Sequence, residues 1–398
     1  MPARNPIIMH SHLGWDWVWQ RPQQFASRLA QRRRLLFVDA LQVLEGIEEP
    51  RFEIRAAPSA PGVTLLQMQF PASRFGDGAW VDAQRTRLLR EALSGPLREQ
   101  FDSPLQWFYD PMAAPCFVGQ AGERANIYDC MDELSGFRFA QPELIERERG
   151  LLCRADLVIT GGRHLCRAKS AFNANCHFHG CGVDVEHFSH LHRGAAPPEL
   201  EGITAPILGY FGVVDERLDY ELIARLADAN AGWHLVFVGP RAKVEDSELP
   251  RRNNIHWLGK REYAELPAYA SRFDVCLMPF ALNEATAFIN PTKALEYMAA
   301  ARPIVSTAVP DVVSNFGSVV HVARSHGAFV QACRRALLSG EAVEDRIERG
   351  LEMARANTWD MVASRIEALL DQLPSAIGSK RDAASNPTRP ARTPAAST

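Results

Sequence analysis

A run in the last third of the chain, residues 290–299, combines residue types that could bind a phosphorylated ligand. Asn290 is a suitable helix N-cap, and Pro291 suits the first helical position, where a missing N–H costs nothing. The free backbone amides at a helix start and the helix dipole both attract phosphate. Thr292 adds a hydroxyl beside these amides, and Lys293 adds a positive charge. We therefore expect phosphate groups to bind at this turn.

Glu296 follows Thr292 by four residues, which places its carboxylate one turn further along the same helix face. A sugar nucleotide presents its diphosphate close to its ribose diol, so a phosphate-binding turn followed by a carboxylate matches both groups. The run therefore predicts a site for a nucleotide diphosphate sugar. The alternative is a solvated Lys293 and Glu296 on an ordinary capped helix, and the spacing alone does not separate the two interpretations.

The elements that must position this run alternate short apolar segments with segments of helical spacing, as in parallel sheets covered by helices. The strands expected in the first half are residues 6–11, 35–39, 63–70, 105–109, 125–129, 156–160 and 176–179. Those in the second half are residues 207–211, 234–238, 255–257, 275–279, 304–306 and 319–322. Helices are expected at residues 21–33, 81–101, 327–338 and 343–373, and the last could pack back across both domains.

The alternation lapses between residues 190 and 206, in a polar stretch that contains Gly and Pro. We therefore predict a first domain over residues 1–195 and a second over residues 196–373, and the run 290–299 makes the second the nucleotide-sugar-binding domain. Residues 374–398 are rich in Ala, Ser, Pro and Thr and have almost nothing to bury, so we predict a disordered tail. Two such α/β domains bind ligands where the carboxyl ends of their sheets meet.

The composition is that of a globular enzyme. The 398 residues exceed what one core usually serves, and 46% of them are hydrophobic. The net charge of −3 offers no footprint for nucleic acid. Because no apolar run is long enough to span a membrane and the start lacks a signal-peptide layout, we expect a cytoplasmic protein. The eight cysteines lack metal-ligand spacing, and no Asp-x-Asp metal signature is present.

Continued to residue 307, the run resembles the donor-binding motif of retaining glycosyltransferases of the GT-B fold, of the large group 1 type. In that family a helix bearing Glu is followed by small residues and by Gly-x-Pro-Val-Val. Residues 181–188 (Cys-Gly-Val-Asp-Val-Glu-His-Phe) are similar to the family's interdomain link, Asn-Gly-Val-Asp-x-x-x-Phe. Residues 12–22 and 128–133 resemble a bacterial branch associated with envelope or exopolysaccharide synthesis. The resemblance covers residues 5–370 and implies two Rossmann-like domains that face each other across a cleft, with C-terminal helices.

Three positions depart from the family pattern. Phe288 stands where the family has a first glutamate that touches the donor sugar, and Asn283 or Glu284 from the preceding loop could substitute for it. Cys181 replaces the first Asn of the link motif, and Arg302 replaces the Gly before the Pro. Neither of the last two changes removes a phosphate-binding group.

The resemblance implies a second cation in the loop after the first strand of the second domain, and Arg217 is the residue assigned to it. Gly212 in the same loop lets the backbone approach the donor. An arginine can bind a diphosphate bidentately and stabilise the leaving group without a metal. The alternative is that Arg217 only pairs with Asp215 or Asp219 on the surface.

In the first domain, the resemblance implies that Gly14 allows close backbone approach to the donor phosphate or the acceptor. Trp15, Trp17 and Trp19 alternate along the same loop and could present stacking surfaces to a sugar or lipid acceptor. The alternative is that they plug the core. Trp15 is the acceptor-side candidate.

Two strand ends supply the remaining candidates. Tyr109 stands where related enzymes have a His that reaches the donor sugar, and Asp110 is expected to contact sugar hydroxyls. Asp129, at the end of the next strand, is a candidate for the acceptor. Carboxylates at strand ends also serve as helix caps, which is the alternative for both.

We therefore expect a glycosyltransferase that moves a sugar from a nucleotide diphosphate sugar to a saccharide or lipid-linked acceptor, with Arg217, Lys293 and Asp110 as catalytic residues. The resemblance implies retention of configuration, and neither a metal nor another cofactor is expected. A further hypothesis is a peripheral contact with the inner face of the membrane through the basic residues 32–34. The alternative is that these arginines form a solvated face or complement the helix dipole. A catalytically silent sugar-nucleotide-binding protein and a sugar-nucleotide epimerase are the alternative functions.

Overall fold

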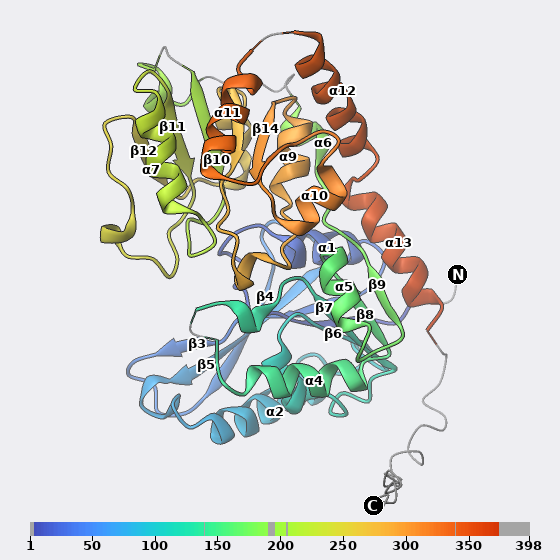
Figure 1. Ribbon diagram of the computed structural model, residues 1–398. Coiled ribbons are helices and arrows are strands. Elements are labelled where there is room, and N and C mark those ends of the chain that lie inside the picture. The colour runs from blue at the N-terminus through green and yellow to red at the C-terminus, as the bar shows by residue number, and fades with distance from the viewer. Residues whose placement is uncertain (1–3, 139, 190–195, 204–205, 339, 374–398) are drawn as a thin grey trace, which may run out of the picture.

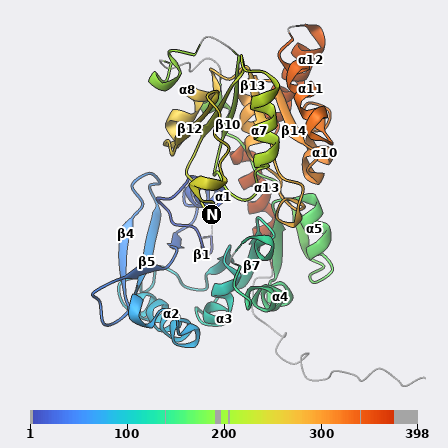
Figure 2. The ribbon, with the colours of Figure 1, turned by 60° about the vertical axis from the view of Figure 1, so that its left-hand side comes forward.

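The computed structural model describes residues 4–373, apart from residues 139, 190–195, 204–205 and 339. It contains two domains, each built on one sheet covered by helices, with the second domain above the first in Figure 1 and Figure 2. The predicted fold class of two Rossmann-like domains is confirmed. The predicted tail, residues 374–398, lies outside the described residues.

The first sheet runs in the order β3 (Gln42–Leu44), β5 (Val63–Pro71), β2 (Leu35–Val38), β1 (Ile7–His10), β6 (Leu105–Phe108), β7 (Ala125–Cys130), β8 (Leu157–Thr160) and β9 (Cys176–Phe178). These strands pair in parallel, and β4 (Arg51–Ala56) adds an antiparallel edge to β5. The central strand β1 pairs with β2 on one side and with β6 on the other. The strand order therefore reverses between β1 and β6, which is where such sheets bind ligands.

The second sheet runs in the order β12 (Ile255–Gly259), β11 (His234–Val238), β10 (Ile207–Phe211), β13 (Val275–Met278), β14 (Ile304–Thr307) and β15 (His321–Ala323). All the pairs are parallel, and β10 pairs with both β11 and β13. The reversal point thus lies between β10 and β13. Strands β10, β11, β13 and β14 are buried along their length apart from one half-buried end, which explains why their sequences read as continuous apolar runs.

The helices of the first domain are α1 (Arg21–Leu29), α2 (Gly78–Ser94), α3 (Ala114–Phe117), α4 (Leu144–Arg154) and α5 (Arg163–Lys169). The link and the second domain contain α6 (Val185–Phe188), α7 (Tyr220–Ala229), α8 (Leu266–Ala270), α9 (Lys293–Ala299), α10 (Pro310–Phe316), α11 (His326–Ala336) and α12 (Glu341–Arg355). No helix in the described ranges is long and apolar enough to cross a membrane. Helix α2 starts earlier than predicted because Asp77 caps it, and it ends before Gly95 and Pro96.

The single helix predicted over residues 343–373 is wrong, because the chain breaks between α12 and α13 (Trp359–Asp371). Thr358 caps α13 by accepting a hydrogen bond from the Met361 amide, and it also forms a β-bridge with Val183 of the link. Trp359, Val362 and Ile366 then enter the core of the first domain. Helix α13 therefore packs on the first domain, although it lies within the residues predicted for the second (Figure 1).

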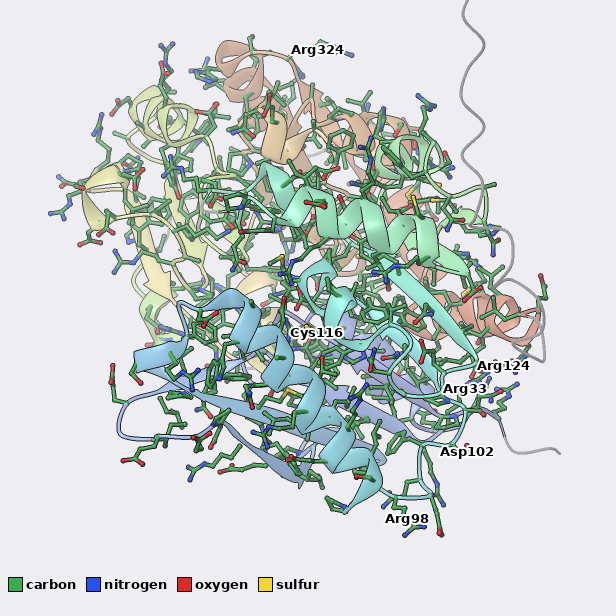
Figure 3. All side chains as sticks on the ribbon, turned by 90° about the horizontal axis from the view of Figure 1, so that it is seen from below. Arg33, Arg98, Asp102, Cys116, Arg124 and Arg324 are labelled. Carbon is green, nitrogen blue, oxygen red and sulfur yellow. The ribbon has the colours of Figure 1, made fainter. Side chains whose placement is uncertain are left out.

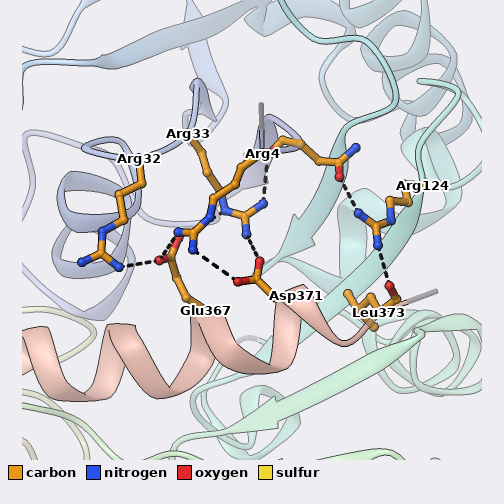
Figure 4. A network of polar contacts seen from close by, with 8 residues as sticks. Arg4, Arg32, Arg33, Arg124, Glu367, Asp371 and Leu373 are labelled. Atoms are coloured by element: carbon orange, nitrogen blue, oxygen red, sulfur yellow. Dashed lines mark hydrogen bonds and ion pairs between the residues drawn. The ribbon is translucent and has the colours of Figure 1, made fainter. Parts of the chain in front are cut away.

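Three arginines of the first domain hold α13 in place (Figure 4): Arg4, which precedes β1, and Arg32 and Arg33, which follow α1. Glu367 accepts from Arg4 at 2.6 Å and from Arg32 at 2.8 Å, and Asp371 accepts from the buried Arg33 at 2.9 Å. Figure 3 shows Arg33 on the same side of the domain as Arg124, whose guanidinium donates to the carbonyl of Leu373. Within the basic run only Arg33 is buried, whereas Arg32, although paired, is 57% exposed and Arg34 is also exposed, so the membrane contact stays a prediction.

Candidate functional site

A cleft of about 670 Å³ lies between the carboxyl ends of the two sheets. The first domain lines it with residues 15–21, which follow β1, and with the loop after β7. The second domain lines it with the loops after β10, β11, β12 and β13 and with the start of α9. Both strand-order reversals therefore open into one cleft, as expected for a ligand site in this architecture.

Lys293 at the start of α9 is a cation held in the cleft by aromatic rings rather than by an ion pair. Its Nζ lies 5.2 Å from the ring centroid of Tyr210 and 5.3 Å from that of Phe280. No carboxylate of the described residues lies within 4 Å of it. Burial lowers the pKa of Lys293, and the neighbouring Arg217 lowers it further. The charge of an anion bound in the cleft would raise the pKa of Lys293 against both effects, so the site favours a negatively charged ligand.

Gly212 makes room for this lysine. Its φ of +135° is a backbone conformation that other residues rarely adopt. A Cβ atom on Gly212 would lie 3.0 Å from Cε and 3.3 Å from Nζ of Lys293. Gly212 therefore allows the Lys293 side chain to come close to the backbone. Its predicted role, close approach of the backbone to the donor, stays a prediction.

Glu296 lies one turn further along α9 and also lines the cleft. Burial raises the pKa of its carboxyl, against the effect of Lys293, which lowers it. A half-buried carboxyl with unsatisfied acceptor capacity is suited to hydroxyl donors such as a ribose diol. The predicted pair of Lys293 and Glu296 is thus brought together on the cleft wall.

The start of α9 differs from the prediction. Asn290 is not the N-cap, because α9 begins at Lys293 and Thr292 occupies the cap position without a side-chain cap bond. The Asn290 amide instead donates to the carbonyl oxygen of Gly161 in the first domain at 2.9 Å. Pro291 and Thr292 form a preceding turn, in which the Ala294 amide donates to the Pro291 carbonyl oxygen. Asn290, Pro291 and Thr292 still line the cleft, but Asn290 joins the domains.

Arg217 lines the cleft. It is also paired with Asp215, one of the two partners named as an alternative to a role in donor binding. Its guanidinium donates to both oxygens of Asp215, at 3.0 Å from Nε and 2.7 Å from Nη2. The side chain is nevertheless 24% exposed, whereas that of Asp215 is 7% exposed. Arg217 therefore retains N–H donors for a ligand while Asp215 fixes its orientation.

Asp132 is a site residue that the sequence candidates omit. It follows β7 and lines the first-domain side of the cleft. Burial raises the pKa of its carboxyl, and Arg217 is the largest opposing influence, with Lys293 also acting on it. A first-domain carboxyl therefore faces the two second-domain cations. In the sequence, residues 128–133 contributed only to the family resemblance, and no residue spacing distinguished Asp132 from its neighbours.

The tryptophans in the loop after β1 differ in location, since Trp15 lies in the core and Trp17 lies at the cleft. Trp15 is 3% exposed and packs edge-on against Phe37 and Trp19, so it plugs the core with one edge at the cleft. Trp17 is 41% exposed and lines the cleft mouth. Gly14 is not among the lining residues, and a Cβ there would meet only ordinary contacts. The structure therefore gives no steric reason for a glycine at residue 14.

The strand-end candidates of the first domain serve the fold. Asp110 accepts from the Met112 amide at 2.9 Å and pairs with Arg85 at 3.0 Å. Asp129 is fully buried and pairs with Arg21 at 2.9 Å. Tyr109 is 1% exposed within the first-domain core. None of Tyr109, Asp110 and Asp129 lines the cleft.

The loop before α9 packs against the first domain. Asn283 accepts a hydrogen bond from the Thr286 amide at 3.2 Å and caps a single 3-10 turn, Glu284–Thr286, which contacts the 3-10 turn Leu134–Gly136. Asn283 and Glu284 are exposed and do not line the cleft. Phe288, where the family has a glutamate, packs against the first-domain core. The structure therefore offers no substitute carboxylate from this loop.

A second polar contact joins the domains next to Asn290. His164 of α5 hydrogen-bonds through Nδ1 to the fully buried Asp311 of α10. Arg163 donates to Asn315 at 2.8 Å, and Asn315 donates to Asn290 at 3.3 Å. The turn that precedes α9 is thus tied to the first domain through Asn290.

No cluster of three or more His, Cys, Asp or Glu side chains among the described residues is placed to hold a metal ion. The absence of a resident metal stays a prediction, as do the roles assigned to the individual site residues.

Comparisons with known proteins agree with this geometry. Residues 205–339 match the family described as "Glycosyl transferases group 1". The chain is 27% identical over 263 residues to TuaH of Bacillus subtilis (strain 168), whose name is that of a teichuronic acid biosynthesis glycosyltransferase. That match covers 60% of this chain and 65% of the relative.

Solved structures share the whole fold. The sucrose-phosphate synthase of Thermosynechococcus elongatus aligns with a TM-score of 0.71 at 15% identity, over 93% of this chain and 99% of that one. An E. coli structure titled trehalose-6-phosphate bound with UDP-2-fluoro glucose aligns with a TM-score of 0.68 at 13% identity, over 93% and 100% of the two chains. The chain therefore has the GT-B fold, and residues 205–339 of its second domain are similar to the glycosyl transferases group 1 family.

Proposed function

We propose that this protein is a glycosyltransferase that takes a sugar from a nucleotide diphosphate sugar and attaches it to a saccharide or lipid-linked acceptor of the cell envelope. The observation that carries the proposal is the cleft between the two reversal points, where Lys293 stands without an ion pair beside Glu296 and Arg217. The group 1 domain, the similarity to TuaH and a neighbour titled as bound with UDP-2-fluoro glucose support it.

In the proposed reaction the bond between the anomeric carbon and the diphosphate oxygen breaks, and the electron pair leaves with the diphosphate. The acceptor hydroxyl forms the new bond to the anomeric carbon and loses its proton. Lys293 and Arg217 would stabilise the developing negative charge on the diphosphate, because both cations already line the cleft before the reaction. Asp215 holds the Arg217 guanidinium ready, so little reorganisation is needed.

The first domain would supply the acceptor side. Asp132 lies opposite the two cations and is the carboxyl best placed to contact a sugar hydroxyl or the acceptor. Trp17, exposed at the cleft mouth, offers an apolar surface for a sugar ring or lipid. Retention of configuration and independence from a metal follow from the family resemblance and are part of the proposal.

The proposal is tested by measuring nucleoside diphosphate release from a panel of nucleotide sugars with envelope saccharide and lipid-linked acceptors. Replacing Lys293 with Ala should lower kcat/KM by about 100-fold or more, the effect of removing one charge-stabilising donor. Arg225→Ala is the matched control, since it removes one exposed positive charge from α7, outside the cleft. Transfer that survives Lys293→Ala at the unmodified rate would contradict the proposal.

A catalytically silent sugar-nucleotide-binding protein is the second candidate, and one observation favours it. Phe288 packs into the first-domain core where the family has a carboxylate. Such a protein would bind the donor with the same dependence on Lys293 but would release no diphosphate with any acceptor. Equilibrium binding together with the release assay therefore separates the two candidates.

A further inference from the structure

Tyr263 lines the same cleft and has a buried hydroxyl with no assigned partner. It opens the 3-10 turn Tyr263–Glu265 after β12 and lines the cleft with Glu296. Its hydroxyl is buried and has no hydrogen-bond partner within the described ranges, although the Gln24 side chain of α1 lies beside it. A buried hydroxyl without a partner is costly, so its presence at a ligand cleft points to a partner on the ligand.

The ring that carries this hydroxyl is held in one orientation. His187 stacks on it with ring centroids 4.4 Å apart and an interplanar angle of 11°. Phe188 meets it edge-on at 5.7 Å. The Nε2 atom of His187 lies 2.9 Å from the carbonyl oxygen of Tyr263, within hydrogen-bond distance. Ring and backbone are thus both fixed from α6, and the hydroxyl is preorganised rather than free to turn away.

The hydroxyl lies near the carboxyl that the proposed function assigns to the ribose. Tyr263 and Glu296 both line the cleft, and the charge of Glu296 adds to burial in raising the pKa of Tyr263. Glu296 in turn follows the phosphate-binding turn by one helical turn. A ribose bound by Glu296 would therefore bring its hydroxyl oxygens within reach of a donor from Tyr263.

We propose that the Tyr263 hydroxyl recognises the ribose together with Glu296, so that the cleft selects ribonucleoside over 2′-deoxyribonucleoside diphosphates. The inference rests on the proposed function. Glu296 accepts hydrogen bonds from the ribose diol, and the Tyr263 hydroxyl donates to the 2′ oxygen. A 2′-deoxy ligand lacks the oxygen that would accept from the tyrosine hydroxyl, so it forgoes this hydrogen bond and binds more weakly.

The experiment uses isothermal titration of the full chain with UDP, GDP, ADP and CDP, and with the 2′-deoxy analogue of whichever binds most tightly. The wild type should bind the ribo form about tenfold or more tightly than the deoxy form. Tyr263→Phe should weaken the ribo form by about three- to tenfold and leave the deoxy form within about twofold. Binding of inorganic pyrophosphate, which has no ribose, should not change.

Tyr128→Phe is the matched control, because it removes one tyrosine hydroxyl from the first-domain core, where that hydroxyl donates to Glu148 at 2.7 Å. It should leave both nucleotide affinities unchanged, and unfolding midpoints confirm that each variant is folded. Equal losses for ribo and deoxy ligands in Tyr263→Phe, or no loss, overturn the inference. If no nucleoside diphosphate binds the wild type, the proposed function fails as well. Binding that needs Lys293 but not the Tyr263 hydroxyl overturns only the inference.

Discussion

The affinity of the cleft for a nucleoside diphosphate should fall as the pH rises, because Lys293 attracts phosphate only as an ammonium ion. In the empty cleft, burial and then Arg217 lower the pKa of Lys293, so its proton is lost below the usual pKa of about 10.4. A bound diphosphate places negative charge beside Nζ and raises that pKa again. In the pH window between the pKa of Lys293 in the empty cleft and its higher pKa in the complex, the complex therefore holds more protons than the free protein.

Within that window the association constant should fall by up to about tenfold per pH unit, because each binding event takes up one proton. Titration calorimetry from about pH 7.5 to about pH 9.5, in buffers of different ionisation enthalpy, measures both the affinity and the protons taken up. Lys293→Arg should bind with little pH dependence over this range, since arginine keeps its charge. Arg225→Ala should behave as the wild type. A flat affinity without proton uptake in the wild type would refute the assignment of Lys293.

Three further predictions concern the framework of the site. Asp129→Asn should lower the free energy of unfolding by about 3–5 kcal/mol in denaturant titration, because it leaves the buried Arg21 without its carboxylate; a loss below 1 kcal/mol would be inconsistent with a buried pair. Gly162→Ala should destabilise by about 1–3 kcal/mol in the same assay, since a Cβ there lies 2.4 Å from Oδ2 of the buried Asp311; an unchanged midpoint would contradict the close domain contact. Burial alone would raise the pKa of the Glu367 carboxyl, but hydrogen bonds from arginines outweigh it and lower the pKa. The free energy of unfolding should therefore fall as the pH drops below about 4.3, the usual pKa of a glutamate. This fall should be weaker in Glu367→Gln.

The sequence predicts the parallel strands well because most of them are buried and apolar. All six strands of the second sheet were predicted, with small shifts at their ends. The first-domain strands β3 and β4 were missed, because the residues of both are exposed or half-buried and form no apolar run. Their stability comes from pairing with β5, which no local pattern reveals.

The break between α12 and α13 was missed for a different reason. Residues on both sides have helical spacing, and Thr358, which caps α13, also pairs with Val183 of the link, far away in the chain. The partners that fix α13 are the arginines near residues 4 and 33, more than 300 positions earlier. Long-range pairs of this kind have no signature in a single sequence.

The same limit applies to the site. Lys293 and Glu296 were found because a predicted helix start marks their surroundings, and Arg217 was found because the family resemblance implies a cation in its loop. Asp110 and Asp129 look equally suitable at strand ends, yet each is taken by an arginine distant in the sequence. Asp132 went unassigned because only the folded chain shows that it faces the cations.

The most direct measurement is a crystal structure of the protein with the tightest-binding nucleoside diphosphate. The account predicts phosphate oxygens within hydrogen-bond distance of Lys293 Nζ and Arg217, and ribose hydroxyls on the Glu296 carboxylate. A nucleotide bound outside the cleft, or bound in it with its phosphates away from Lys293, would contradict the central claim.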